Sequence, residues 1–140
     1  MTAKTYLNQL RSLEATIAAR KAEAERLKAE RTYLQGVSYD SDRVQNSASH
    51  NAQFEHLADI IADTERHITE LAKKRHLIIS QIDGLQRPEY VEILQLRYIE
   101  RQRFEAIACT MGYTYSWTIQ LHGIALQAFA KKYLNGEKSE

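Results

Sequence analysis

The clearest pattern in this chain is a heptad repeat of apolar residues between residues 54 and 85. Side chains at alternating steps of three and four fall on one face of an α-helix. Thr64 and Arg75 are the two polar members of the repeat. Its positions are Phe54, Leu57, Ile61, Thr64, Ile68, Leu71, Arg75, Ile78, Ile82 and Leu85. A seam of this length predicts a long helix packed along a second helix.

A similar repeat precedes it and predicts the partner helix. Its apolar positions are Tyr6, Leu10, Leu13, Ile17, Ala24, Leu27 and Leu34. Arg20 and Arg31 interrupt the seam, so we expect them to reach out to solvent or to meet acidic residues of a partner. The simplest arrangement is an antiparallel, coiled-coil-like hairpin over residues 1–85.

Polar residues and glycines suggest where these two helices begin and end. Thr2 is a plausible N-cap and Gly36 a plausible stop for the first helix. Ser47 and Ser49 offer N-caps for the second helix, and Gly84 offers its stop. The segment from Gly36 to Ser49 is long for a connection between helices, so a short helical turn could lie within it.

Two helices alone bury little apolar surface, which predicts a further partner for the hairpin. The end of the second helix is broadly apolar, with Leu77, Ile78, Ile79 and Ile82. We expect this end to dock on the C-terminal residues, on a second subunit, or on both. The hairpin is therefore interpreted as a dimerisation module or spacer, and the chain as a homodimer.

The remaining residues predict three shorter helices. Pro88 suits the first turn of a helix, and a second helix is expected from about Arg103 to Met111. Its inward face comprises Phe104, Ile107, Ala108 and Met111. Gly112 suits a left-handed cap, and Thr114 can cap a third helix that continues to about Leu134. Its inward face comprises Leu121, Ala125, Leu126, Ala128 and Phe129.

A short helix, a glycine turn and a longer helix indicate a helix-turn-helix unit over residues 86–134, with a polar tail at residues 135–140. The predicted fold class is therefore all-α, a long antiparallel helical hairpin followed by this three-helix unit. We expect a cytoplasmic protein, because the first residues are polar and the uncharged run from Ala106 to Ala130 is too polar for a membrane span. Cys109, the single cysteine, lies in an apolar stretch and is expected to be a buried, inert thiol.

Catalysis and cofactor binding find no support in the sequence. It contains no glycine-rich phosphate loop, no His-x-x-x-His or Cys-x-x-Cys pair and no nucleophile paired with a base. We therefore expect neither an enzyme nor a cofactor or metal site. His122 is interpreted as a packed or solvent-edge histidine.

The C-terminal unit resembles the fourth region of bacterial sigma factors. The residues concerned are Leu94-Gln-Leu-Arg-Tyr-Ile99, Phe104-Glu-Ala-Ile-Ala108, Met111-Gly-Tyr-Thr114 and Leu121-His-Gly-Ile-Ala-Leu126. They resemble still more the phage and prophage regulators of late transcription of the RinA and ArpU kind. The segment Asp42-Arg-Val-Gln-Asn-Ser47 is also similar to one in related phage proteins. The resemblance implies a phage transcription regulator in a bacterial host, with host RNA polymerase as a further partner.

This resemblance and the helix pattern together select candidate DNA contacts. Base contacts are expected from the first exposed turn and a half of the third helix, at Tyr115, Ser116, Trp117 and Gln120. Phosphate contacts are expected from Arg97, Arg101, Arg103, Lys131 and Lys132. The third helix departs from the family pattern, because no Lys or Arg occurs from Thr114 to Ala130.

The charge balance predicts that any binding to DNA by one copy is weak. The whole chain carries a formal net charge of +1, and residues 86–134 carry six basic and four acidic residues. One copy should bind duplex DNA weakly and lose affinity as salt rises, so two copies in a dimer would help. The alternative is a protein-interaction scaffold whose Trp117 and Tyr115 contact RNA polymerase or another phage protein.

Overall fold

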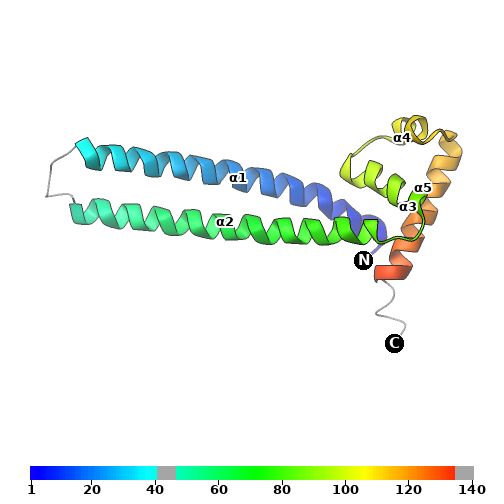
Figure 1. The fold of residues 1–140 in the computed structure, drawn as a ribbon, viewed down its shortest axis with the longest axis horizontal. Helices are drawn as coiled ribbons and strands as arrows, with labels where there is room; N and C mark the ends of the chain where they lie inside the picture. The colour runs from blue at the N-terminus through cyan, green and yellow to red at the C-terminus, as the bar shows by residue number, and fades with distance from the viewer. Residues whose placement is uncertain (41–46, 135–140) are drawn as a thin grey trace. The chain divides into compact units, whose positions relative to one another are not determined.

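All regular structure in the described part of the protein is helical. The computed structural model (Figure 1) describes the backbone of residues 1–40 and 47–134 and the side chains of residues 1–36 and 51–134. Within those ranges the elements are all helices, and no strand occurs. The all-α prediction is confirmed. The predicted tail at residues 135–140 and most of the segment Asp42–Ser47 lie outside the described residues.

Two long helices precede a series of short ones. They are α1 (Ala3–Asp40) and α2 (Ser47–Asp83). The short helices are α3 (Pro88–Leu94), the π-helix η2 (Gln95–Ile99), α4 (Phe104–Met111), α5 (Tyr115–Phe129) and the π-helix η3 (Ala130–Leu134). The chain divides into two compact units. Unit 1 consists of Met1–Glu14 and Lys74–Glu140, and unit 2 of Ala15–Lys73. The boundary predicted at residue 85 lies within unit 1.

Helix boundaries agree with the prediction except near the connection between the long helices. Gly84 directly follows the last residue of α2, and Pro88 occupies the first turn of α3, both as expected. The stop predicted at Gly36 is wrong, because α1 continues to Asp40. A glycine within a helix costs only about 1 kcal/mol relative to alanine, so it permits a stop without forcing one. Ser49 lies inside α2, which begins at Ser47, and is therefore not its N-cap.

Within unit 2, α1 and α2 run side by side in opposite directions (Figure 1). Ala24 of α1 and Leu57 and Ile61 of α2 are buried, and Lys28 Nζ lies 3.0 Å from Glu65 Oε2 across the pair. All ten predicted seam positions from Phe54 to Leu85, nine of them in α2, are buried or half-buried. Arg20 is exposed and pairs with Glu23 one turn further along α1, so this interruption of the seam is solvated.

The core of unit 1 draws on helices from both ends of the chain. Helix α5 packs against α3 and α4. Buried apolar side chains come from α1, α2 and the short helices, and include Leu7, Leu10, Ile78, Ile82, Ile93, Leu94, Ile107, Leu121, Ala125 and Phe129. Each buried Leu, Ile or Phe stabilises the fold by about 1.5–3 kcal/mol relative to an exposed one. The apolar end of α2 thus contributes Ile78 and Ile82 to this core, whereas Leu77 remains 54% exposed.

Candidate nucleic-acid interface

The connection between α4 and α5 takes the form that the sequence predicted. Gly112 caps α4 with φ of +73°, in the left-handed region that favours glycine. Thr114 caps α5, and its Oγ1 accepts a hydrogen bond of 3.1 Å from the backbone N–H of Trp117. The backbone N–H of Tyr113 donates to the Ala108 carbonyl at 3.0 Å. These contacts fix the direction in which α5 leaves the turn.

The four predicted base-contact residues share the exposed start of α5. Tyr115 is 52% and Trp117 41% exposed, and Ser116 and Gln120 are exposed as well. We call the exposed, uncharged surface around them the α5 face, which comprises Tyr113, Tyr115, Ser116, Trp117, Ile119, Gln120 and Ile124. Two of its three aromatic residues contact each other, since the rings of Tyr113 and Trp117 meet edge to face with their centres 6.5 Å apart. The surface combines planar, polar and apolar groups without a charge.

The opposite face of α5 carries two buried polar residues, Thr118 and His122. The hydroxyl of Thr118 donates to the Thr114 carbonyl at 2.8 Å. His122 Nε2 lies 2.8 Å from the Tyr98 hydroxyl, and its ring meets that of Phe104 edge-on at 5.0 Å. His122 is therefore packed, which is one of the two environments that the sequence left open for it.

Burial shifts the proton affinities of this polar pair. It lowers the pKa of His122 to about 4, with smaller contributions from the positive charges of Arg97 and Lys4. It also raises the pKa of Tyr98 to about 12, against the opposing effect of Arg97. At neutral pH the phenol is protonated and the imidazole neutral, so the phenol can donate to Nε2. The pair joins η2 to α5 without burying a charge.

Two of the predicted phosphate contacts, Arg97 and Arg101, are held by other residues. Arg97 is half-buried, with its guanidinium carbon 4.1 Å from the centre of the Phe104 ring. Its Nη1 donates to the Gln102 carbonyl at 3.0 Å. Arg101 has a positive φ of 57°, which costs a residue with a Cβ about 1 kcal/mol. Its Nη2 donates to Glu14 Oε2 at 2.5 Å.

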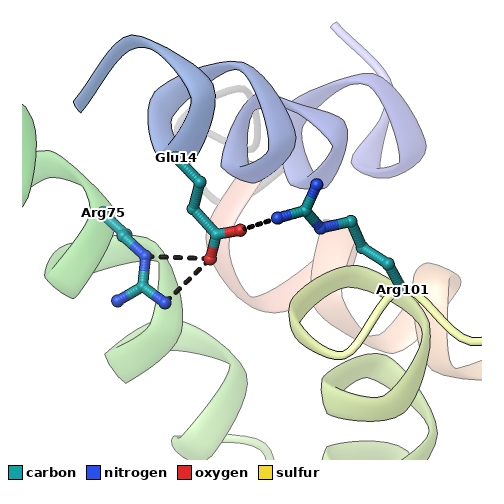
Figure 2. Close-up of polar contacts among 3 residues, drawn as sticks. All are labelled: Glu14, Arg75 and Arg101. Atoms are coloured by element: carbon teal, nitrogen blue, oxygen red, sulfur yellow. Dashed lines mark hydrogen bonds and ion pairs between the residues drawn. The ribbon is translucent and has the colours of Figure 1, made fainter. Parts of the chain in front are cut away.

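Glu14 joins three segments of unit 1. Its Oε1 accepts hydrogen bonds from Nε and Nη2 of Arg75, at 3.1 and 2.8 Å. Figure 2 shows the guanidinium groups of Arg75 and Arg101 approaching the Glu14 carboxylate from two sides. The Glu14 side chain is 19% exposed, compared with 50% for that of Arg101. The start of α1 is thereby tied to the end of α2 and to the segment that follows η2.

The other three predicted phosphate contacts are exposed at the ends of helices. Arg103 precedes α4 and makes no side-chain cap there. Lys131 and Lys132 lie in η3, after α5, and Lys132 Nζ donates to the Gly84 carbonyl. The structure therefore brings the four predicted base-contact residues together on α5, and distributes the five predicted phosphate-contact residues over η2, the segment before α4, and η3.

Cys109 differs from its predicted environment. It is exposed, so the expectation of a buried thiol is wrong. The inward face of α4 consists of Phe104, Ile107, Ala108 and Met111, as predicted, and Cys109 falls outside that face. The apolar stretch around it reflects neighbours that point inward, not the thiol itself.

Two kinds of feature were not found among the described residues, a metal-ligating cluster and a helix that could span a membrane. No group of three His, Cys, Asp or Glu side chains there could hold a metal ion. Of the helices in the same ranges, none combines the length and apolar character needed to cross a membrane.

Comparisons with protein-family models, with curated proteins and with solved structures found no match to this chain.

Proposed function

We propose that the protein is a transcription regulator of the phage or prophage kind, which binds duplex DNA through α4 and α5 as a helix-turn-helix. One observation carries the proposal. The left-handed turn at Gly112 and the cap at Thr114 present Tyr115, Ser116 and Gln120 together on the first exposed turns of a 15-residue helix. Recognition helices contact base edges in the major groove from this part of the helix.

The side chains on this surface suit base recognition. A glutamine can pair with the N6 and N7 atoms of adenine, and a serine hydroxyl can bond to several base edges. Tyr115 and Trp117 offer planar apolar surface to thymine methyl groups and to the sugar. Because the α5 face carries no cation, phosphate attraction comes from the flanking residues Arg103 and Lys131, which are exposed.

Dimerisation is part of the proposal, because one copy has little charge with which to hold DNA. Doubling the unit doubles the number of phosphates that are neutralised and doubles the slope of affinity against salt. The long helices α1 and α2 are the proposed dimerisation module, and the exposed Leu77 beside the buried Ile78 supplies an apolar contact. The spacing of the two recognition helices would then fix the spacing of the DNA half-sites.

A second candidate function is protein binding, with RNA polymerase or another phage protein as partner. The observation that favours it is the apolar character of the α5 face, where Trp117, Ile119 and Ile124 are each about 40% exposed. Aromatic residues at the centre of such patches dominate protein–protein binding energy. In this reading Trp117 is the anchor and Gln120 lies at the rim.

The decisive experiment compares two glutamines of α5 in a DNA-binding assay. Fluorescence anisotropy would be measured at low salt on duplex fragments of the genome that encodes the chain. Gln120→Ala should weaken specific binding about 10-fold, the effect of one lost bidentate base contact. Gln127→Ala is the control, because Gln127 is exposed about 10 Å further along the helix. If the unaltered protein raises the anisotropy of no duplex fragment at low salt, DNA binding is refuted.

A second pair of variants, Trp117→Ala and Gln120→Ala, distinguishes the DNA-binding function from the protein-binding function. Capture of purified host RNA polymerase after nuclease treatment, abolished by Trp117→Ala and unchanged by Gln120→Ala, would favour protein binding. Circular dichroism and thermal unfolding would establish that Trp117→Ala keeps its fold. Loss of DNA affinity in both variants without polymerase capture would favour the DNA-binding function.

A further inference from the structure

A small cavity in unit 1 is lined mainly by cationic and polar side chains. Helix α1 contributes Leu7, Asn8 and Arg11, whereas η2 and the segment after it contribute Arg97, Tyr98 and Arg101. The cavity volume is about 150 Å³, which accommodates one tetrahedral oxyanion with its water. We call this cavity the arginine notch. No carboxylate is among its lining residues, although Glu14 binds Arg101 from outside it.

Two of the three arginines are oriented before any ligand arrives. Arg97 is fixed by the Phe104 ring on one side and by the hydrogen bond to the Gln102 carbonyl. Arg101 is fixed through Nη2 by Glu14. A guanidinium has five N–H donors, so each arginine keeps further donors after these contacts. Side chains that are already oriented lose less entropy when they bind a ligand.

Arg11 is the third cation, and it is the least engaged. It is exposed, and among the described residues it makes no ion pair. The lining of the notch therefore carries three positive charges and no negative one, and of these three arginines only Arg101 contacts the Glu14 carboxylate. Guanidinium forks match the oxygens of phosphate in pairs, and the Asn8 amide can donate to a third oxygen.

We propose that the arginine notch binds a phosphate group, and that this group is a backbone phosphate of the bound DNA. The second part rests on the proposed function. The notch belongs to the same compact unit as α4 and α5, and η2 packs directly against α4. In helix-turn-helix proteins the helix before the recognition helix crosses the DNA backbone, so a phosphate site beside α4 fits that geometry. Arg11 and Asn8 of α1 thereby join the DNA interface.

The experiment compares two arginines of α1 that differ in their position relative to the notch. Arg11→Gln and Arg26→Gln remove the same charge from exposed sites, but Arg26 lies in unit 2. Anisotropy would be measured on a 20-base-pair duplex over a series of salt concentrations. Arg11→Gln should weaken binding about 5- to 10-fold and reduce the salt slope by about one per copy. Arg26→Gln should change the affinity less than 2-fold. Equal losses in the two variants would overturn the assignment to a DNA phosphate.

A second arm tests the notch without DNA. The arginine Nε–H signals of the full chain would be followed by NMR during addition of inorganic phosphate, with sodium chloride at equal ionic strength as reference. Shifts confined to Arg11, Arg97 and Arg101 are expected. If the unaltered protein fails to bind any duplex, the proposed function fails, and this arm decides the notch alone. Shifts that chloride reproduces would then overturn it, and phosphate-specific shifts would keep it as a site for free phosphate.

Discussion

The hydroxyl of Tyr98 lies 2.8 Å from Nε2 of His122, and this contact joins η2 to α5 inside unit 1. Because burial lowers the pKa of His122 to about 4, the folded protein keeps the ring neutral where the unfolded chain protonates it at about pH 6.5. The unfolded state therefore binds more protons between these values. His122 therefore leaves the free energy of unfolding unchanged above about pH 6.5 and lowers it progressively as the pH falls from 6.5 towards 4.

This relationship predicts a histidine-dependent loss of stability in mild acid. The shift corresponds to about 3 kcal/mol of unfolding free energy, lost between about pH 6.5 and 4. Urea unfolding at pH 7.5, 6.0, 5.0 and 4.5 would measure it. His122→Gln should be less stable at pH 7.5 but should depend less on pH. His76→Gln, at an exposed position of α2, is the control and should follow the unaltered protein. Parallel curves for all three proteins would refute the role of His122.

Two glycines near the α5 face should respond to alanine with opposite signs. An added Cβ meets nothing within 4 Å at Gly112 or at Gly123. At Gly112 the positive φ remains, so Gly112→Ala should destabilise by about 1 kcal/mol. Gly123 lies inside α5, where alanine should stabilise by about 0.5–1 kcal/mol. Thermal unfolding of the two variants would measure both effects. A neutral Gly112→Ala would show that the left-handed turn is not required.

The Glu14 junction should contribute more stability than an ordinary surface ion pair. Glu14→Gln removes the charge that both Arg75 and Arg101 contact, and should lower the unfolding free energy by about 1–2 kcal/mol. Glu23→Gln breaks the more exposed pair with Arg20 and should cost at most about 0.5 kcal/mol. Chemical denaturation with urea would compare them. Repeating it in 1 M NaCl should narrow the difference, because Arg101 is half exposed. Equal costs would argue against a special role for Glu14.

Cys109 should react readily in the folded protein. Its side chain is exposed on α4, so Ellman's reagent should modify it without prior unfolding. The rate in buffer should be within about tenfold of the rate in 6 M urea, because no opening of the core is needed. A reaction hundreds of times slower in the native state would mean that the thiol is covered, by a second copy for example. Cys109→Ser serves as the blank for both measurements.

Periodicity explains why the long helices could be predicted so well. Apolar residues at alternating steps of three and four share one face only in an α-helix, and each position of the repeat from Phe54 to Leu85 is buried or half-buried. Gly36 and Cys109 show the limits of composition. A glycine allows a helix to end, and an apolar neighbourhood does not say which way a given side chain points. The helical spacing of Phe104, Ile107, Ala108 and Met111 defines the inward face of α4 and by itself places Cys109 outside that face.

The candidate site was predictable only where it depends on local structure. The turn at Gly112, the cap at Thr114 and the exposed start of α5 follow from neighbouring residues. The buried pair of Tyr98 and His122 does not, because a polar residue in a core needs a partner that lies elsewhere in the chain. That Arg11 and Arg97 line the same cavity likewise depends on how the fold brings α1 and η2 together, which no spacing in the sequence reveals.

Unit 1 is built from two segments that lie far apart in the sequence, and this affects the order in which the protein folds. The ring of Tyr6 lies 5.7 Å from that of Phe129, so the first turns of α1 share a core with the last turn of α5, which is synthesised much later. Such contacts between distant residues slow folding, because the intervening chain must be closed into a loop first. During synthesis α1 can pair with α2 while α5 is still within the ribosome. We therefore expect the α5 face to form only after all the described helices have been translated.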